Sequence, residues 1–360
     1  MKDNCNDVVF SETIISRYDD QTGDFFLLGK SIKRICHDVK IEGCIDLLWP
    51  NFFQKNMFDD NLQFALGQAR EQIFHYTEEI DDTLLEMSPL EAIRALVSRI
   101  PDGNDFTTAL HVVAAPAVFA PAFIRMKRGR HIIRPDSSLP HSADILRMMN
   151  VSMPEPQEAQ ALDTFLISVV DFGLTPATLA ARISASERQS ITSSIITALS
   201  VLSEKNQKCN PTAASNILDI LSSEKMTDDW PVAAIDGNAP TQERGSLSTS
   251  NGDVRADIIK STLVNLQNDI GLRVSSKVSL IESLDDKFID DQNNYNGNNG
   301  LFTRHKIYSA LLLEQLGFPS EVFSCVVAMG RTVGWVAHCR EQMQTPWLVR
   351  PTLRYTGVEE

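Results

Sequence analysis

The chain has 360 residues, enough for about two domains at roughly 150 residues each. Lys and Arg number 33 and Asp and Glu number 47, so the formal net charge is −14, and 43% of the residues are hydrophobic. This composition excludes a disordered chain, a fibrous repeat and a disulfide scaffold, and the acidity argues against nucleic acid or an anionic membrane surface as a partner. A local basic pocket for one anionic ligand is still permitted.

Cysteine usage and the N-terminus both indicate a cytoplasmic protein. The six cysteines are scattered without a Cys-x-x-Cys pair, which is typical of buried, reduced thiols. The polar, acidic N-terminus lacks the apolar segment of a signal peptide, and no stretch approaches about 20 apolar residues. We therefore expect neither secretion nor a membrane-spanning helix.

Helical periodicity dominates, so we predict an all-α fold. Near the start of the chain, residues 24–28 are the best strand signal and indicate a short hairpin. Ser88 and Glu91 have the spacing of a capping box, with Pro89 suited to the first helical position. The apolar residues that follow, as far as Ile100, share one face of the predicted helix.

The rest of the chain repeats this helical pattern. Residues 108–124 are apolar and predict one buried helix, or a pair broken by Pro116 and Pro121. Further helices are predicted over residues 161–170, 177–183 and 306–316, and over a long segment that Ser320 caps and that ends near Met343.

Two polar segments, residues 226–252 and 285–300, interrupt the pattern and bracket a candidate small domain. The second is rich in Asp, Asn and Gly, but its spacing does not match a calcium-binding EF-hand loop. Residues 23–31 have five residues between two glycines, where a phosphate-binding loop needs four. The seven histidines show no metal-ligand spacing, so we expect no metal site.

Five blocks in family order resemble the citrate synthase family. The most specific is residues 330–342, Gly-Arg-Thr-Val-Gly-Trp-Val-Ala-His-Cys-Arg-Glu-Gln, preceded by residues 301–319 and followed by 348–357. Residues 163–176 are also similar, and their Gly-Leu-Thr-Pro ending is closest to the citryl-CoA lyase-like branch. The resemblance covers nearly the whole chain. It implies a homodimer in which each chain has a large helical domain (1–210 and 316–360) and an inserted small helical domain (211–315).

The resemblance also implies a site for a small anionic substrate. In this family arginines bind the two carboxylates of oxaloacetate, because a guanidinium matches a carboxylate with two hydrogen bonds. Arg255, in Asp-Val-Arg-Ala, and Arg331, in Gly-Arg-Thr-Val-Gly-Trp, match two of them. Arg350, in Arg-Pro, matches a third that reaches the site of the other subunit. The alternative for each is a solvated surface arginine.

The family's catalytic positions are substituted. In the family a carboxylate removes a methyl proton from acetyl-CoA, one histidine stabilises the enol oxygen and another polarises the ketone of oxaloacetate. By resemblance Asn210 lies near the first histidine, Ser246 replaces the second, Phe172 replaces the histidine of an Asp-His pair, and Lys306 replaces the aspartate. His305 could also act as a base, although it would point elsewhere on a helix. The structural alternatives are that Phe172 is a core residue, that Ser246 lies in a loop and that Lys306 is an exposed lysine.

These substitutions leave three functions open. The first is a diverged acyltransferase that condenses an acyl-CoA such as acetyl-CoA with a 2-oxo dicarboxylate such as oxaloacetate or an analogue, or runs the reverse lyase reaction. The second is an inactive family member that binds a di- or tricarboxylate or serves as a partner subunit. The third is a structural scaffold. A CoA thioester would be a co-substrate and not a tightly bound cofactor, and the sequence identifies no residues that bind it.

Overall fold

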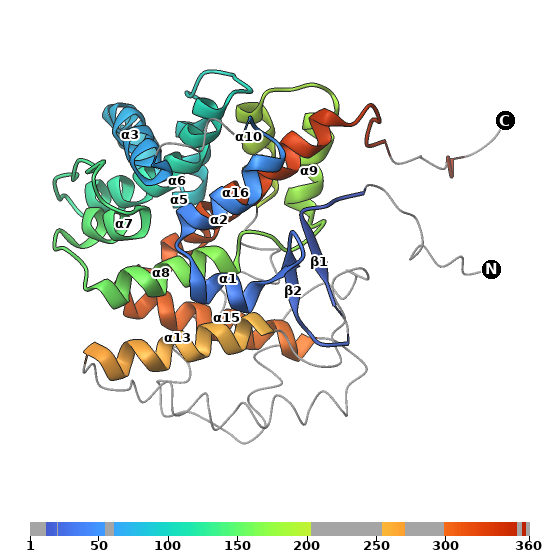
Figure 1. Ribbon diagram of the computed structural model, residues 1–360. Coiled ribbons are helices and arrows are strands. Elements are labelled where there is room, and N and C mark those ends of the chain that lie inside the picture. The colour runs from blue at the N-terminus through green and yellow to red at the C-terminus, as the bar shows by residue number, and fades with distance from the viewer. Residues whose placement is uncertain are drawn as a thin grey trace.

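The computed structural model describes residues 12–19, 21–54, 61–202, 254–270, 299–350 and 355–357, with the backbone alone at 267–270 and 299–304. Its helices confirm the predicted all-α class (Figure 1). The α-helices are α1 (Ile32–Asp38), α2 (Ile41–Leu48), α3 (Leu62–Phe74), α4 (Asp82–Glu86), α5 (Pro89–Val97), α6 (Phe106–Lys127), α7 (His141–Asn150), α8 (Pro156–Ser168), α9 (Pro176–Ser186), α10 (Ile191–Val201), α13 (Val254–Ile270), α15 (Asn299–Gln315) and α16 (Phe323–Gln344). Short 3₁₀ turns are η2 (Trp49–Asn51), η4 (His75–Glu79) and η5 (Ser320–Val322).

A small antiparallel sheet lies near the start of the chain, in the order β1 (Ser16–Tyr18), β2 (Phe25–Leu27) and β3 (Lys30–Ser31). Phe25 and Leu27 are buried on one side of β2, as the period of a strand requires. Gly29 has a φ of +78°, which suits glycine and allows the tight turn into β3. The predicted hairpin is therefore part of this sheet.

The two prolines in the apolar segment do not break its helix, because α6 runs without interruption from Phe106 to Lys127. Each proline removes one helical hydrogen bond, at Pro116 and at Pro121. Packing holds the helix instead: α6 contacts α3, α5, α7 and α16, and most of its side chains are buried. Its apolar window and that of η5–α16 are long enough to cross a membrane, but they are 83% and 100% buried inside the protein, as in core helices.

The other predicted helices are present, with shifted ends. The capping box of Ser88 and Glu91 opens α5. Helix α8 begins earlier than predicted, because Glu155 and Glu158 form another capping box. The prediction that Ser320 caps the long C-terminal helix is wrong. Ser320 lies in the 3₁₀ turn η5, after Pro319, and α16 begins at Phe323.

Helix α16 approaches α8 closely through two glycines. A Cβ atom at Gly330 would overlap the carbonyl oxygen of Leu166, and one at Gly334 would overlap the carbonyl oxygen of Val170. Only glycine permits this contact, which places the middle of α16 beside the turn that follows α8. The polar residues described below lie at this contact.

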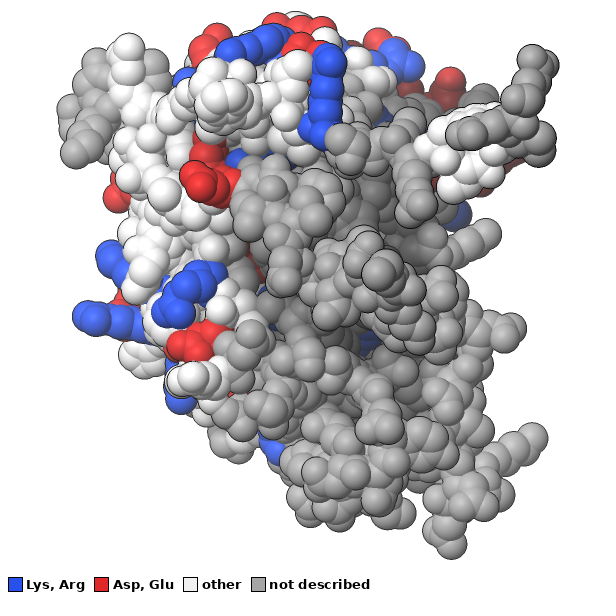
Figure 2. Space-filling view, turned by 90° about the vertical axis from the view of Figure 1, so that its right-hand side faces the viewer, with Lys and Arg blue, Asp and Glu red and all other residues white. Residues whose placement is uncertain are grey.

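Helices α13 and α15 lie side by side below α8 (Figure 1), and each also contacts α8. Both belong to the predicted small domain. Its predicted boundary at 210/211 lies outside the described residues, and the division into two domains stays a prediction. On the face shown in Figure 2, the described Lys and Arg side chains alternate with Asp and Glu and form no single basic field.

Candidate functional site

Arg331 is a charged side chain in the middle of the buried helix α16, in a stretch that is otherwise mostly apolar. It lies on α16 and is 3% exposed. Its Nη2 donates to the hydroxyl oxygens of Thr175 and Thr178, both at 2.8 Å, and its Nη1 lies 3.7 Å from Asp171 Oδ1. Thr175 also caps α9 by accepting the N–H of Thr178. The start of α9 therefore fixes the direction of this guanidinium.

Asp171 lies in the turn between α8 and α9, which its own side chain stabilises. Asp171 Oδ1 accepts the N–H groups of Phe172 at 2.8 Å and Gly173 at 3.1 Å, and Gly173 takes a φ of +68°. Burial opposes ionisation of the carboxyl, but His338, Arg331 and a hydrogen bond from Ser16 together lower its pKa to about 2. Asp171 is therefore ionised and balances the charge of Arg331.

Phe172 contacts both of the arginines that the sequence predicts at the site. The Cζ atom of Arg255, on α13, is 4.0 Å from the centre of the Phe172 ring, and that of Arg331 is 5.1 Å away. Arg255 is 1% exposed and also lies 5.4 Å from the ring of Phe25. A cation over an aromatic face is stabilising, and more so away from water. Phe172 thus brings Arg255 and Arg331 together.

His305 and Lys306, the two adjacent candidate bases, lie on α15, and the His305 ring packs against Phe172. Its ring is 2% exposed and meets the Phe172 ring edge-on, with centroids 6.0 Å apart. Lys306 is half-buried, so it does not match the structural alternative of an exposed lysine. Because consecutive helical residues point about 100° apart, the side chains of His305 and Lys306 take different directions. His305 thus points elsewhere than Lys306, as expected, and its ring lies against Phe172.

The other predicted site residues do not join this cluster in the described chain. Arg350 is exposed and its Nη2 lies 3.0 Å from Glu187 Oε1, at the opposite end of α9 from Thr175. Whether Arg350 reaches the site of a partner subunit stays a prediction. Asn210 and Ser246 lie outside the described residues. No group of three or more His, Cys, Asp or Glu side chains within the described part of the chain could hold a metal ion.

Sequence reasoning missed Thr175 and Thr178, which hold Arg331, and His338, which contacts Asp171. The sequence spacing could have identified His338, because it lies seven residues after Arg331 and therefore on the same face of α16. Polar residues at that spacing on an apolar helix indicate a buried polar contact. The threonines gave no such signal, because a threonine that opens a helix is usually only a cap.

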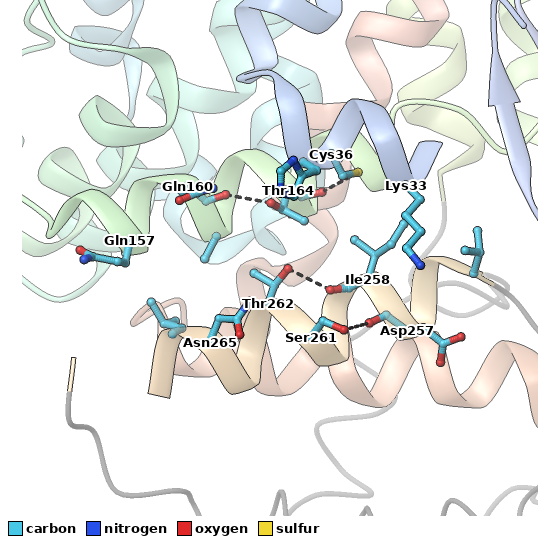
Figure 3. A pocket seen from close by; sticks show the side chains of 14 residues that line it. Lys33, Cys36, Gln157, Gln160, Thr164, Asp257, Ile258, Ser261, Thr262 and Asn265 are labelled. Carbon is cyan, nitrogen blue, oxygen red and sulfur yellow. Dashed lines mark hydrogen bonds between the residues drawn. The ribbon is translucent and has the colours of Figure 1, made fainter. Parts of the chain in front are cut away.

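A separate cavity of about 340 Å³ lies where α13 faces α1 and α8 (Figure 3). Phe172 and Arg331 do not line it. Cys36 lies in its wall and donates to the carbonyl oxygen of Thr164, and burial raises the pKa of this thiol far above its ordinary value. Cys36 is therefore a buried thiol and not a nucleophile. The remaining lining is Lys33, His37, Gln157, Gln160, Ala161, Val254, Asp257, Ile258, Ser261, Thr262, Asn265 and Leu266.

The fold is all-α and of the citrate synthase type. A crystal structure of citrate synthase from Thermotoga maritima matches with a TM-score of 0.82 at 19% identity, covering 100% of this chain and 97% of that one. The citrate synthase of Thermoplasma acidophilum, solved as a ternary complex with carboxymethyl coenzyme A and oxaloacetate, matches with a TM-score of 0.74 at 18% identity, covering 99% of this chain and 96% of that one.

The sequence comparisons carry the family assignment. The family model described as citrate synthase, C-terminal domain, matches residues 4–352, and the chain therefore belongs to the citrate synthase family. Citrate synthase of Haloferax volcanii is 26% identical over 372 residues, which is 98% of this chain and 95% of that protein. Citrate synthase 2 of Bacillus subtilis is 23% identical, again covering 98% and 95%.

Proposed function

We propose that this chain is a diverged acyltransferase that condenses an acyl-CoA, such as acetyl-CoA, with a 2-oxo dicarboxylate such as oxaloacetate. The observation that carries the proposal is the convergence of Arg255 and Arg331 on one ring, that of Phe172. Their guanidinium carbons can be no further apart than the two ring distances combined, which suits a small dicarboxylate. Each guanidinium can bind one carboxylate with two hydrogen bonds, and the threonine contacts orient Arg331 before the substrate arrives.

The chemistry needs one base and one proton donor. The base takes a proton from the methyl group of the acyl-CoA, and the resulting enolate carbon forms a bond with the ketone carbon of the acceptor. The ketone oxygen takes up a proton and becomes a hydroxyl, and water then cleaves the thioester to release CoA. His305 is our candidate base, because it is buried beside Phe172 and a neutral imidazole accepts a proton near neutral pH. Lys306 is the second candidate.

A second function is a non-catalytic member of the family that binds a di- or tricarboxylate, alone or as a partner subunit. Phe172 favours it, because an apolar ring in contact with two arginines neither donates a hydrogen bond nor transfers a proton. A positioned acid or base typically contributes about 10²- to 10⁴-fold to a rate. The loss of such groups would leave the arginine pair as a binding site.

One pair of measurements separates the two functions. Thiol release from acetyl-CoA is followed over a panel of 2-oxo acids, and the melting temperature is followed with citrate or oxaloacetate. A ligand at 100 times its Kd stabilises by about 2.7 kcal/mol. The test variant is Arg331→Ala. The matched control is Arg340→Ala on the same helix, whose guanidinium contacts the carbonyl oxygens of Phe52 and Asn104 instead.

Each outcome of the two measurements supports or excludes a particular function. Thiol release that Arg331→Ala abolishes and Arg340→Ala preserves supports the enzyme, and His305→Gln or Lys306→Met then identifies the base. A melting shift that depends on Arg331, without thiol release from any acceptor, supports the binding protein. The absence of both effects overturns both functions.

We also propose a cytoplasmic homodimer, from the resemblance of the C-terminal segment to that of the family. Trp347, Leu348 and Tyr355 are large hydrophobic residues exposed near Arg350, as a segment that covers a partner would require. The described cysteines are free and buried, which suits a reducing compartment. Light scattering should give twice the mass of the chain, and a monomer at micromolar concentration would contradict the proposal.

A further inference from the structure

A row of buried polar side chains continues from Arg331 into the neighbouring helices. Asp171, whose Oδ1 faces Arg331, has its other oxygen, Oδ2, 3.2 Å from Nε2 of His338. On the other side of the same imidazole, Nδ1 lies 3.0 Å from Nη1 of Arg182, on α9. Asp171, His338 and Arg182 are all 2% exposed or less. The His338 ring therefore connects the carboxylate beside Arg331 to a second arginine.

This row ends at the N-terminal segment. Arg182 forms a buried ion pair with Glu341, one turn after His338 on α16. The other oxygen of Glu341 accepts the N–H of Ile14 at 2.8 Å, and Arg182 Nη2 donates to the carbonyl oxygen of Glu12 at 3.0 Å. The backbone that leads into β1 is thus tied to the same charges that surround His338.

The contact with Arg182 determines where His338 carries its proton. A guanidinium has five N–H donors and no acceptor, so Nδ1 of His338 must be the acceptor and carry no proton. A neutral imidazole then has its proton on Nε2, which is the nitrogen that faces Asp171. The opposite tautomer would place a lone pair against the carboxylate of Asp171 and an N–H against Arg182.

We propose that Arg182, His338 and Glu341 are positioning residues for the dicarboxylate site. Arg182 and Glu341 hold His338 in the Nε2-protonated tautomer, His338 fixes Asp171 Oδ2, and Asp171 orients Arg331. These residues set the affinity of Arg331 for a carboxylate although they do not touch it. The proposal rests on the proposed function for the ligand, but the tautomer of His338 follows from the contacts alone.

A matched control exists elsewhere in the same chain. Arg70, on α3, donates from Nε to Asp144 Oδ2 at 2.9 Å, and its Nη1 lies 3.1 Å from Nδ1 of His141. Both arginines are fully buried and both face a histidine and a carboxylate, but Arg70 contacts α7 and not the turn that holds Asp171. Arg70→Met therefore removes the same kinds of contact as Arg182→Met without touching the proposed row.

The test combines nitrogen NMR of the imidazoles with titration calorimetry, using citrate and oxaloacetate as probes. The folded protein should show His338 with an unprotonated Nδ1 and a protonated Nε2, and Arg182→Met should mix the two tautomers. In Arg182→Met and in the near-isosteric Glu341→Gln, Kd should rise on the order of tenfold. Arg182→Lys, which keeps a donor, should recover part of the affinity. Arg70→Met should lower the melting temperature but leave Kd within about twofold.

The proposal is overturned if His338 keeps its tautomer in Arg182→Met, or if Arg70→Met weakens binding as much as Arg182→Met does. If the unmodified protein binds neither probe, the proposed function fails. The positioning role is then decided by the His338 signal and by the guanidinium N–H signal of Arg331, which Arg182→Met should shift and Arg70→Met should not. Glu341→Gln supplies the same comparison if Arg182→Met does not fold.

Discussion

The guanidinium of Arg255 lies against the ring of Phe172, 4.0 Å from its centre. The two residues come from distant parts of the chain, Arg255 from the start of α13 and Phe172 from the turn between α8 and α9. The same ring lies 5.1 Å from the guanidinium carbon of Arg331. One apolar side chain therefore keeps two like charges in a common buried site.

Replacing Phe172 with leucine tests this role. Phe172→Leu keeps an apolar side chain but removes the aromatic face, and desolvated cation–π contacts contribute about 2 kcal/mol. We expect a loss of stability of about that size in urea unfolding and a weaker melting shift with citrate. Phe53→Leu is the control, because Phe53 lies 4.7 Å from the guanidinium of Arg340, outside the site. An equal loss of citrate response in both variants would contradict the assignment.

Asp171 should contribute stability that disappears in acid. Its pKa is lowered from 3.8 in the unfolded chain to about 2 in the fold, so the folded state holds the proton less tightly. The contribution is complete above about pH 4 and is lost as the pH falls towards 2, and it amounts to about 2 kcal/mol at neutral pH. Asp171→Asn should lower the urea midpoint at pH 7 and flatten its decline between pH 4 and 2. Asp38→Asn, at an exposed carboxylate, should change the pH 7 midpoint little.

Asp163 should behave in the opposite sense. This buried carboxyl accepts the N–H of Ile41 at 3.1 Å and the hydroxyl of Ser142 at 2.7 Å, and burial, with Glu42 nearby, raises its pKa to about 7. The folded state holds the proton more tightly than the unfolded chain, so stability is greatest below about pH 4 and falls as the pH rises towards 7.

Asp163→Asn removes the charge and keeps an oxygen acceptor. We expect it to raise stability at pH 8 on the order of 4 kcal/mol relative to the unmodified chain, and to have little effect near pH 4. Melting curves at the two pH values provide the measurement. An equal change at both would show that the charge of Asp163 is not the cause.

Gly334 should be intolerant of any side chain. A Cβ there would overlap the carbonyl oxygen of Val170, so Gly334→Ala must push α16 away from the turn that holds Asp171. We expect a loss of about 3 kcal/mol in stability, together with loss of any dicarboxylate response. Gly129→Ala is the comparison, because Gly129 has open space around it and only its φ of +65° opposes a side chain. Its cost should be about 1 kcal/mol, with the ligand response unchanged.

Capping residues and the periodicity of apolar residues made part of this structure predictable. The capping box at Ser88 and Glu91 marked the start of α5, and periodic apolar residues marked α8, α9 and α15. These sequence patterns failed where packing between helices determines the structure. They left residues 108–124 as one helix or two, whereas α6 is continuous because neighbouring helices bury it on nearly all sides.

The sequence by itself determined the helical class, the family resemblance and the identity of Arg255 and Arg331 as candidate ligands of an anion, because these depend on residue type, order and spacing. Only the tertiary structure decided that Phe172 contacts both arginines, that His305 packs against that ring, and that Arg182 reaches His338. Such contacts join segments far apart in the chain, so their geometry depends on how the helices pack. The overall charge of −14 says nothing of a site formed in this way.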